Sequence, residues 1–379
     1  MKKVCFILFL FSTVLLRVSA LELTNYSKSA VLLEPTTNTI IYDLNKDERL
    51  APASMTKLMT LLLIMEAIDS NKISLDDKVL ISKNAASMGG SQVFLEENSE
   101  IEVNQLLKGI AIASGNDAAV AMAEYIAGTT DEFVKMMNNK VKELGLKNTN
   151  FVNVHGLDAE NHYSSAYDMS QIAIELLKHE KILEYTSLYE DYLIKPDGTK
   201  TWLVNTNKLV RFYEGIDGLK TGYTSTAKYC LTATGMKNNI RFVSVVMGVD
   251  TSEHRSLDTS NMFNYAFANY KLNKIINTDD EIAEIEIKKG VKEKVNIYAK
   301  EDVTDLIKQN EEKDYSFKME KYSITAPINS GDVVGNLEIL DNNGKVVKIV
   351  DLVVKESVEK HSFATLFGLN FKNIVNGYL

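Results

Sequence analysis

The sequence predicts an α+β protein, in which a sheet flanked by helices is followed by a small all-β domain and a C-terminal amphipathic helix. Strand-like segments lie near both ends of residues 21–275, and the chain between them is mostly helical. This order favours one sheet with helices packed against it. From about residue 277 the chain changes to short strand-like segments separated by turn residues, which is typical of an all-β domain.

The first domain begins with two strands within residues 29–44, joined by a turn at residues 34–38. Helical patterns follow in five runs, at residues 55–69, 103–112, 117–126, 130–144 and 165–179. Gly128 and Gly145 come just after two of these runs, where glycine commonly ends a helix. Strands return at residues 192–194, 202–203, 229–235 and 240–249, before a last helix over residues 252–268.

The β domain is expected over residues 276–355. Its strands are predicted at residues 282–287, 294–298, 316–324, 335–340 and 346–354. Turn signals separate them, among them Asn329-Ser330-Gly331 and Asp341-Asn342-Asn343-Gly344. Short strands between such signals predict a compact all-β unit.

Residues 356–379 have a different pattern. Their apolar residues largely follow spacings of three and four, at Phe363, Leu366, Phe367, Phe371, Ile374, Val375 and Tyr378. An amphipathic helix with aromatic residues suits a membrane interface, so we predict that this helix binds the membrane surface. The alternative is a helix that packs on the β domain.

Residues 1–20 are predicted to be a secretory signal peptide. Lys2 and Lys3 precede an apolar stretch over residues 4–16, and the small residues Val18-Ser19-Ala20 form a cleavage site. The apolar stretch is too short to span a bilayer comfortably. We therefore expect export, with the mature chain at the extracytoplasmic face of the cytoplasmic membrane or in the cell wall.

Charge and cysteine content exclude several classes of function. The formal charge of the chain is −9, and cleavage removes Lys2, Lys3 and Arg17 but no acid, which leaves −12. Such an acidic chain has no electrostatic basis for binding nucleic acid. Only Cys230 remains after cleavage, so no intrachain disulfide is possible. The five histidines are scattered and form no zinc-binding pattern.

The tetrapeptide S-x-x-K occurs three times, beginning at Ser54, Ser225 and Ser357. Only the first leads into a long apolar run that predicts a buried helix. Positions i and i+3 lie on one face of a helix, so Ser54 and Lys57 can meet. Ser225 precedes a strand-like run, in which side chains three apart point to opposite faces, and Ser357 lies in a charged segment. Ser54 is therefore the candidate nucleophile.

Two further motifs follow, Ser114-Gly115-Asn116 and Lys220-Thr221-Gly222. Alone, the first would be a common helix N-cap and the second a turn into a strand. Together with Ser54 and Lys57 they supply a nucleophile, a second hydroxyl with an amide, and a cationic strand edge. These parts suffice for acyl transfer with lysine in place of a protease's histidine. They match the S-x-x-K, S-x-N and K-T-G set of serine penicillin-binding proteins and β-lactamases.

Longer stretches around the motifs make the resemblance more specific. They are residues 52–57, 114–119, 155–158, 163–168, 205–209, 215–224 and, in the β domain, 325–335. In all of them the chain resembles the low-molecular-weight penicillin-binding proteins, specifically the serine-type D-alanyl-D-alanine carboxypeptidases. The resemblance implies a β-lactamase/transpeptidase-like domain over residues 21–275, with an antiparallel sheet flanked by helices.

The same resemblance implies an activity and its partners. The substrates would be peptidoglycan stem peptides ending in D-Ala-D-Ala, from which the terminal D-alanine is removed outside the cytoplasmic membrane. β-Lactam antibiotics would acylate the enzyme and inhibit it. No cofactor or metal is implied.

The roles carry over residue by residue. Ser54 would be acylated, and Lys57 would take its proton if burial and a nearby cation lower the lysine pKa. Ser114 would relay a proton to the leaving amine, and Asn116 would hold Lys57 and the substrate amide. All four residues stand in the matching motifs.

The remaining site residues would bind the substrate. Lys220 and Thr221 would face its terminal carboxylate, and Gly222 would allow close approach to the backbone. The backbone N–H groups of Ser54 and Tyr223 would form the oxyanion hole. Arg255, at the start of the helix after residue 250, would help to bind the carboxylate, since a carboxypeptidase must recognise a free C-terminus.

Three alternatives remain open at this point. A β-lactamase of the same fold is disfavoured, because no E-x-x-x-N segment lies between Ser114 and Lys220. A DD-endopeptidase or transpeptidase would use the same groups on another substrate position. A catalytically silent peptidoglycan-binding protein would not need all of the catalytic residues. Thr226 and Lys228 depart from the usual family pattern and leave substrate preference open. His155 is expected to be structural, and Trp202 to be a packing residue.

Overall fold

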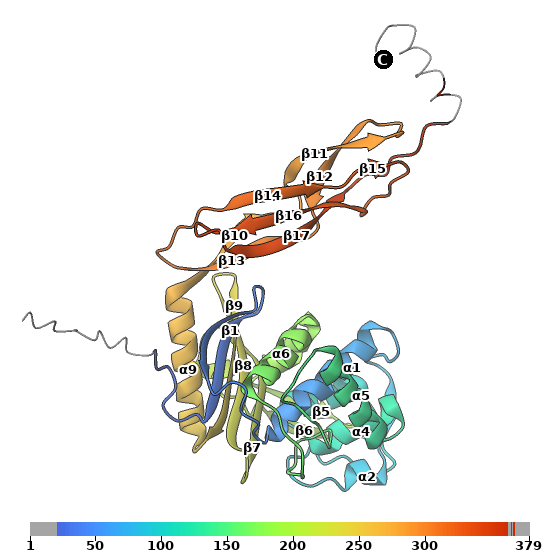
Figure 1. Cartoon of the computed structure of the whole chain (residues 1–379). Coiled ribbons are helices and arrows are strands. Elements are labelled where there is room, and N and C mark those ends of the chain that lie inside the picture. The colour runs from blue at the N-terminus through green and yellow to red at the C-terminus, as the bar shows by residue number, and fades with distance from the viewer. Residues whose placement is uncertain (1–20, 363–364, 366, 368–379) are drawn as a thin grey trace, which may run out of the picture.

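A five-stranded antiparallel sheet lies at the centre of the first domain (Figure 1). The structure is a computed structural model that describes residues 21–362, 365 and 367. The strand order is β2-β1-β9-β8-β7, with these bounds: β1 Ser29–Glu34, β2 Thr39–Leu44, β7 Ile216–Thr224, β8 Lys228–Lys237 and β9 Ile240–Val249. The predicted signal peptide lies outside the described residues, as does most of the predicted C-terminal helix.

Both faces of this sheet carry apolar side chains, and each face is covered by helices. Alternate residues of a strand point to opposite faces, and Val31 and Leu32 of β1 accordingly belong to two different cores. The larger core lies under a helical layer, and α9 (Ser252–Asn269) covers the other face. The predicted sheet flanked by helices is thus confirmed.

The helical layer contains the predicted runs, with ends shifted by a few residues. Its helices are α1 (Lys57–Asp69), α2 (Lys83–Ala86), α3 (Val103–Ala111), α4 (Asn116–Ala127), α5 (Thr130–Glu143), α6 (Ala166–Leu177) and α7 (Leu183–Thr186), with 3₁₀ turns η1 (Ala53–Thr56) and η2 (Glu180–Ile182). The short helix α8 (Leu209–Phe212) instead adds Leu209 to the core under α9. Side chains cap several of the starts: Thr129 accepts from the N–H of Glu132, and Ser165 from that of Asp168. Gly128 ends α4 at φ 82°, as glycine is expected to do.

Two short ribbons lie beside the helices. They are β3 (Lys78–Leu80) with β4 (Glu100–Glu102), and β5 (Glu190–Ile194) with β6 (Lys200–Val204). Trp202 was expected to be a packing residue, but it is 60% exposed. On β6 the neighbouring Leu203 takes the buried face, so alternation leaves Trp202 on the solvent face.

The second domain is all-β, as predicted. Its strands are β10 (Tyr270–Ile276), β11 (Glu281–Lys288), β12 (Lys294–Ala299), β13 (Val303–Lys308), β14 (Ser316–Lys321), β15 (Ile324–Thr325), β16 (Val333–Leu340) and β17 (Val346–Val354). Six form one sheet, and β10 pairs with β13 in a second one. The strand predicted at 316–324 is divided into β14 and β15, and β10 and β13 were not predicted.

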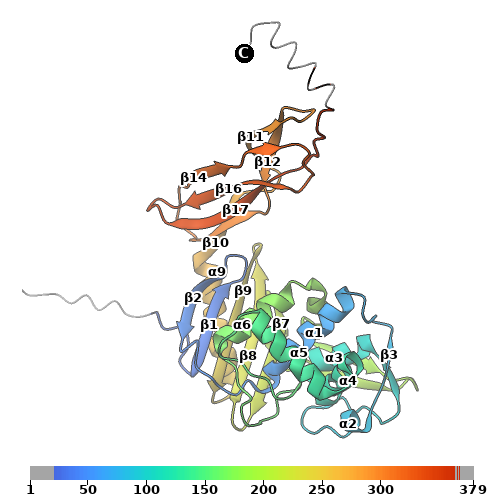
Figure 2. The same cartoon turned by 45° about the vertical axis from the view of Figure 1, so that its right-hand side comes forward.

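The two domains are stacked end to end along α9, and both views show this arrangement (Figures 1 and 2). The β domain stands on one end of that helix, with β11 and β15 toward its far tip. Residue Lys360 forms a bridge to Gly290, next to β11. The continuously described chain therefore ends at the tip that points away from the first domain. No helix among the described residues is long and apolar enough to cross a membrane.

The first residues of the described chain hold α9 in place. The buried carboxylate of Asp258 accepts hydrogen bonds from the backbone N–H groups of Asn25, Tyr26 and Ser27, at 2.9–3.1 Å, and one from the hydroxyl of Ser27 at 2.7 Å. A buried carboxylate is stable when its oxygens accept this many bonds. Asp258 stands one helical turn after Arg255, so the same contacts fix the part of α9 that carries this arginine.

Candidate active site

Ser54 lies in the 3₁₀ turn η1, just before the buried helix α1. Two glycines pack against this turn from different segments. A Cβ on Gly222 of β7 would lie 2.7 Å from the carbonyl oxygen of Pro52 and 3.1 Å from the nitrogen of Ser54. A Cβ on Gly156 would collide with the carbonyl group of Ala53. Both neighbouring segments therefore approach η1 so closely that only glycine fits at positions 222 and 156.

Lys57 is fully buried and its Nζ has three partners. The distances are 2.6 Å to Oδ1 of Asn116, 2.7 Å to the carbonyl oxygen of His155 and 3.1 Å to Oγ of Ser54. The first two oxygens can only accept. A neutral amine has two N–H bonds, which these acceptors use, and one lone pair, which is then left for the hydroxyl proton of Ser54.

The surroundings of Lys57 favour the neutral amine. Burial and then the nearby charge of Lys220 lower the pKa of Lys57 well below its usual value, although Asp117 opposes this. Burial disfavours the charged form because the protein interior solvates it poorly. A lysine with a lowered pKa can act as a general base near neutral pH.

Asn116 begins α4 and is held in the orientation that Lys57 requires. Its Nδ2 donates to the carbonyl oxygen of Gly89 at 2.7 Å, so its Oδ1 is left to face Lys57. Ser114, two residues earlier, has φ 63°. The Ser114 Oγ is buried and has no hydrogen-bond partner among the described residues. A buried hydroxyl without a partner is rare and suggests a group that completes its bonds with substrate.

Lys220 and Arg255 bring two more cations to the same region. Both are buried, at 1% and 6% exposure. Burial, followed by the charge of Arg255, lowers the pKa of Lys220 to about 7. Within the described chain neither of them, nor Lys57, forms an ion pair with a carboxylate, and the Nε of Arg255 has no partner. Buried cations without an acid favour an anionic ligand.

The edge of the central sheet borders these cations. β7 pairs with β8 on one side only, so its other edge is open beside η1. Thr221 donates a hydrogen bond from its hydroxyl to that of Thr206 at 2.6 Å. Tyr223 is 55% exposed, and its ring lies 4.4 Å from that of Tyr229. An open strand edge can pair with an extended peptide.

The structure thus brings most predicted residues into one site. Ser54, Lys57 and Asn116 are joined by hydrogen bonds. The charge of Lys220 acts on Lys57, and the charge of Arg255 acts on Lys220. Groups that the sequence analysis did not assign are the carbonyl oxygens of His155 and Gly89, and Thr206. A backbone carbonyl carries no signature in the residue type, so no sequence signal could have identified the first two.

His155 and His162 form a support behind the nucleophile. Nδ1 of His162 accepts from the N–H of Val152 at 2.9 Å, so the neutral ring carries its proton on Nε2, which lies 2.8 Å from Oγ1 of Thr56. The ring of His155 accepts from the N–H of Leu157, as a hydrogen-bonded structural residue would. Burial lowers the pKa of both histidines to about 4.

The described part of the chain contains no candidate metal site. No group of three histidine, cysteine or acidic side chains is placed there to hold an ion.

Comparisons with known proteins agree with this geometry. The family model described as D-alanyl-D-alanine carboxypeptidase matches residues 17–251, and one for the C-terminal domain of penicillin-binding protein 5 matches residues 270–360. The chain is 50% identical to D-alanyl-D-alanine carboxypeptidase DacF of Bacillus subtilis over 347 residues, which are 91% of this chain and 89% of DacF.

Solved structures show the same similarity. Penicillin-binding protein 5 of Haemophilus influenzae superposes with a TM-score of 0.76 at 33% identity, over 88% of this chain and 98% of that one. The ampicillin-bound penicillin-binding protein D2 of Listeria monocytogenes gives a TM-score of 0.58 at 30% identity, over 64% of this chain and 97% of that one.

The two buried histidines predict an acid-sensitive fold. Between about pH 6.5 and 4, histidines in the unfolded chain bind protons that the folded chain cannot. The free energy of unfolding should therefore fall with decreasing pH, by up to about 1.4 kcal/mol per pH unit for each histidine. Urea unfolding across this range measures the slope.

The variant His162→Gln provides the matched comparison. Its amide can still accept from Val152 and donate to Thr56, but it binds no proton. We expect it to fold and to show a shallower pH slope. The same slope in both proteins would mean that His162 does not carry the acid sensitivity.

Proposed function

The chain belongs to the D-alanyl-D-alanine carboxypeptidase family, and we propose that Ser54 is the nucleophile with which it removes the terminal D-alanine. It is a serine-type carboxypeptidase of the penicillin-binding protein group, which acts in cell wall metabolism and binds β-lactams. The single observation that carries the assignment of Ser54 is its contact with a lysine whose two N–H bonds are already used.

Acylation follows from this contact. Lys57 takes the hydroxyl proton of Ser54, and Oγ attacks the carbonyl carbon between the last two D-alanines. The backbone N–H groups of Ser54 and Tyr223 are proposed to bind the resulting oxyanion, where one such donor typically contributes a factor of about a hundred in rate. The protonated Lys57 gives this proton to Ser114, whose unpartnered hydroxyl passes its own proton to the leaving nitrogen, so both side chains end the step as they began it. The C–N bond breaks, D-alanine leaves and an ester remains on Ser54.

Deacylation uses the same groups in reverse. Lys57 takes a proton from water, the hydroxide oxygen attacks the ester carbon, and Ser54 leaves as its hydroxyl. Asn116 keeps Lys57 aligned in both steps through the 2.6 Å hydrogen bond. Lys57 thus acts as a base toward Ser54 in the first step and toward water in the second, and it returns the proton each time.

Recognition of the free C-terminus is assigned to the buried cations. Lys220 and Arg255 lack acidic partners in the described chain, and Thr221 offers a hydroxyl at the same strand edge. A terminal carboxylate would supply the missing negative charge and would raise the pKa of Lys220 from about 7. Gly222 lets β7 pack directly against η1, because a Cβ there would lie 2.7 Å from the carbonyl oxygen of Pro52, and this close packing brings the strand edge to Ser54.

The domains and location are proposed as follows. Residues 1–20 would be a cleaved signal peptide, 21–275 the catalytic domain, 276–355 the β domain, and 356–379 a helix that binds the membrane surface from the extracytoplasmic side. Two observations support the last part: the apolar spacing of residues 363–378, and the end of the continuously described chain at the β-domain tip away from the catalytic domain (Figure 1).

Intact-mass spectrometry with benzylpenicillin tests the nucleophile. The mature protein should gain the mass of one penicillin, and the Ser54→Ala variant should gain none, because the ester requires the Ser54 oxygen. Release of D-alanine from a soluble pentapeptide should be lost in the same variant. An adduct on Ser54→Ala would refute the assignment. Rapid penicillin hydrolysis without an adduct would indicate a β-lactamase instead.

A truncation tests the membrane helix. Removal of residues 361–379 should shift the protein from the membrane fraction to the soluble fraction, because the apolar face is then lost. Penicillin acylation by the truncated protein is the control, and it should be unchanged. A truncated protein that stays with the membranes would contradict the anchor.

A further inference from the structure

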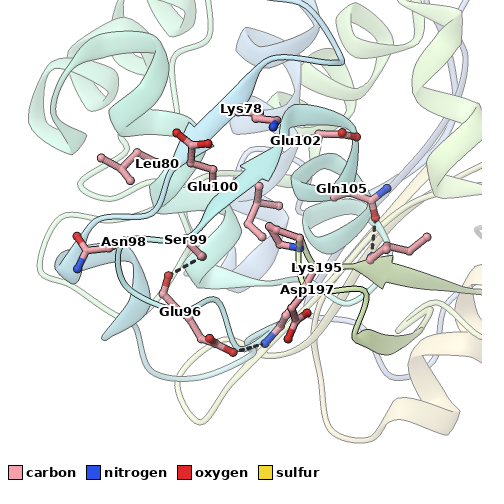
Figure 3. Close-up of a pocket in the computed structure, with 13 residues that line it drawn as sticks. Lys78, Leu80, Glu96, Asn98, Ser99, Glu100, Glu102, Gln105, Lys195 and Asp197 are labelled. Carbon is pink, nitrogen blue, oxygen red and sulfur yellow. Dashed lines mark hydrogen bonds and ion pairs between the residues drawn. The ribbon is translucent and has the colours of Figure 1, made fainter.

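A groove of about 730 Å³ lies between the two short ribbons of the catalytic domain (Figure 3). The β3–β4 ribbon and the loop over residues 96–99 line one side, and residues 194–197 of the β5–β6 hairpin line the other. Lys195 pairs with Glu96 at 2.9 Å and so joins the two sides. Gln105 is only 9% exposed and accepts from the N–H of Ile194.

An exposed aromatic face continues this groove along the hairpin. Tyr192 and Trp202 are cross-strand neighbours, and Ile194 lies two residues from Tyr192 on the same face. Their side chains are 49%, 60% and 46% exposed. Ile194 also lines the groove, so the aromatic face and the groove form one surface. Large exposed apolar residues that are contiguous mark a binding surface more often than scattered ones do.

Both walls of the groove are joined to the catalytic site through short stretches of chain. On one side, Gly89 accepts from Asn116, and the N–H groups of Val93 and Leu95 donate to Asp117, just before Glu96 enters the groove. On the other side, Thr206 bonds to Thr221. Trp202 is four residues from Thr206, so their Cα atoms are at most about 14 Å apart.

The hairpin that borders the groove is joined to the site at its leaving-group end. In the proposed binding mode the scissile carbonyl faces Tyr223 and the terminal carboxylate faces Lys220 and Thr221. The substrate therefore runs antiparallel to β7, and its carboxylate end points toward Thr206. The stem peptide being cut ends there, so a groove beyond that end is free to bind another part of the polymer.

We propose that the aromatic face and the groove bind a glycan strand of peptidoglycan that neighbours the strand being trimmed. This inference rests on the proposed function. The C–H faces of pyranose rings pack on aromatic rings, and sugar hydroxyl and acetamido groups pair with carboxylates and amides. Both kinds of group are present: Tyr192 and Trp202 on the face, and Glu96, Glu100 and Gln105 in the groove. The lining holds two lysines against four acids, so it disfavours an anionic ligand and suits a neutral one.

The first test uses the fluorescence of Trp202, the only tryptophan in the chain. The mature full-length protein is first acylated with penicillin, so that the peptide site is blocked. It is then titrated with oligomers of N-acetylglucosamine, which present the same sugar rings and acetamido groups without a charge. We expect a saturable change in tryptophan emission. No change at any accessible glycan concentration would overturn the proposal.

The second test compares two substrates in Trp202→Ala. Turnover of a soluble pentapeptide without sugars should stay unchanged, whereas kcat/KM on polymeric peptidoglycan should fall about five- to tenfold, the scale of one lost aromatic contact. Phe317→Ala is the matched control, because Phe317 is 52% exposed on β14 of the β domain, and it should change neither rate.

The results distinguish a failure of the glycan site from a failure of the carboxypeptidase activity. Equal losses on both substrates in Trp202→Ala would overturn the glycan site. Quenching of Trp202 by a soluble cross-linked stem peptide, and not by glycan, would overturn it in favour of a peptide site. Failure of the wild-type protein to release D-alanine from the soluble pentapeptide would instead refute the proposed function.

Discussion

The amine of Lys57 is the group on which the rest of the site depends. It is buried, and its two N–H bonds are taken by Asn116 and by the carbonyl oxygen of His155, so its lone pair is available only to Ser54. Each partner is fixed by a further contact: Asn116 by Gly89, and the His155 segment by the bonds of His162 to Val152 and Thr56. A base held in this way needs no rearrangement when the reaction begins, which is the main advantage of a preorganised site.

The other cations serve this arrangement in two ways. Burial is the main reason why the pKa values of Lys57 and Lys220 are lowered, and the charge of Lys220 lowers the first and that of Arg255 the second still further. The same charges form the carboxylate site at the open edge of β7. Arg255 stands on α9, which the first described residues hold through the four hydrogen bonds to Asp258. Substrate binding is therefore coupled to contacts far from the nucleophile along the chain.

The sequence was informative where side-chain chemistry alone defines a role. Three short motifs led to Ser54, Lys57, Asn116 and Lys220, and the helical runs were located to within a few residues because their apolar periodicity is strong. Three kinds of feature could not be predicted. The carbonyl oxygen of His155 has no signature in the residue type, the exposure of Trp202 depends on which face of a short hairpin is covered, and β10 and β13 pair across many residues. All three depend on tertiary packing, which the local pattern of residue types does not determine.

The most direct test of the central claim is the pH dependence of penicillin acylation in Asn116→Asp. A carboxylate beside Nζ favours the protonated lysine, so the pKa of Lys57 should rise by one or more pH units, on the order of a close ion pair. The rising limb of the acylation rate should then move to higher pH by the same amount, and Asn116→Ala should not reproduce this shift. A rising limb at the same pH in the wild type and in Asn116→Asp would show that Lys57 is not the base that activates Ser54.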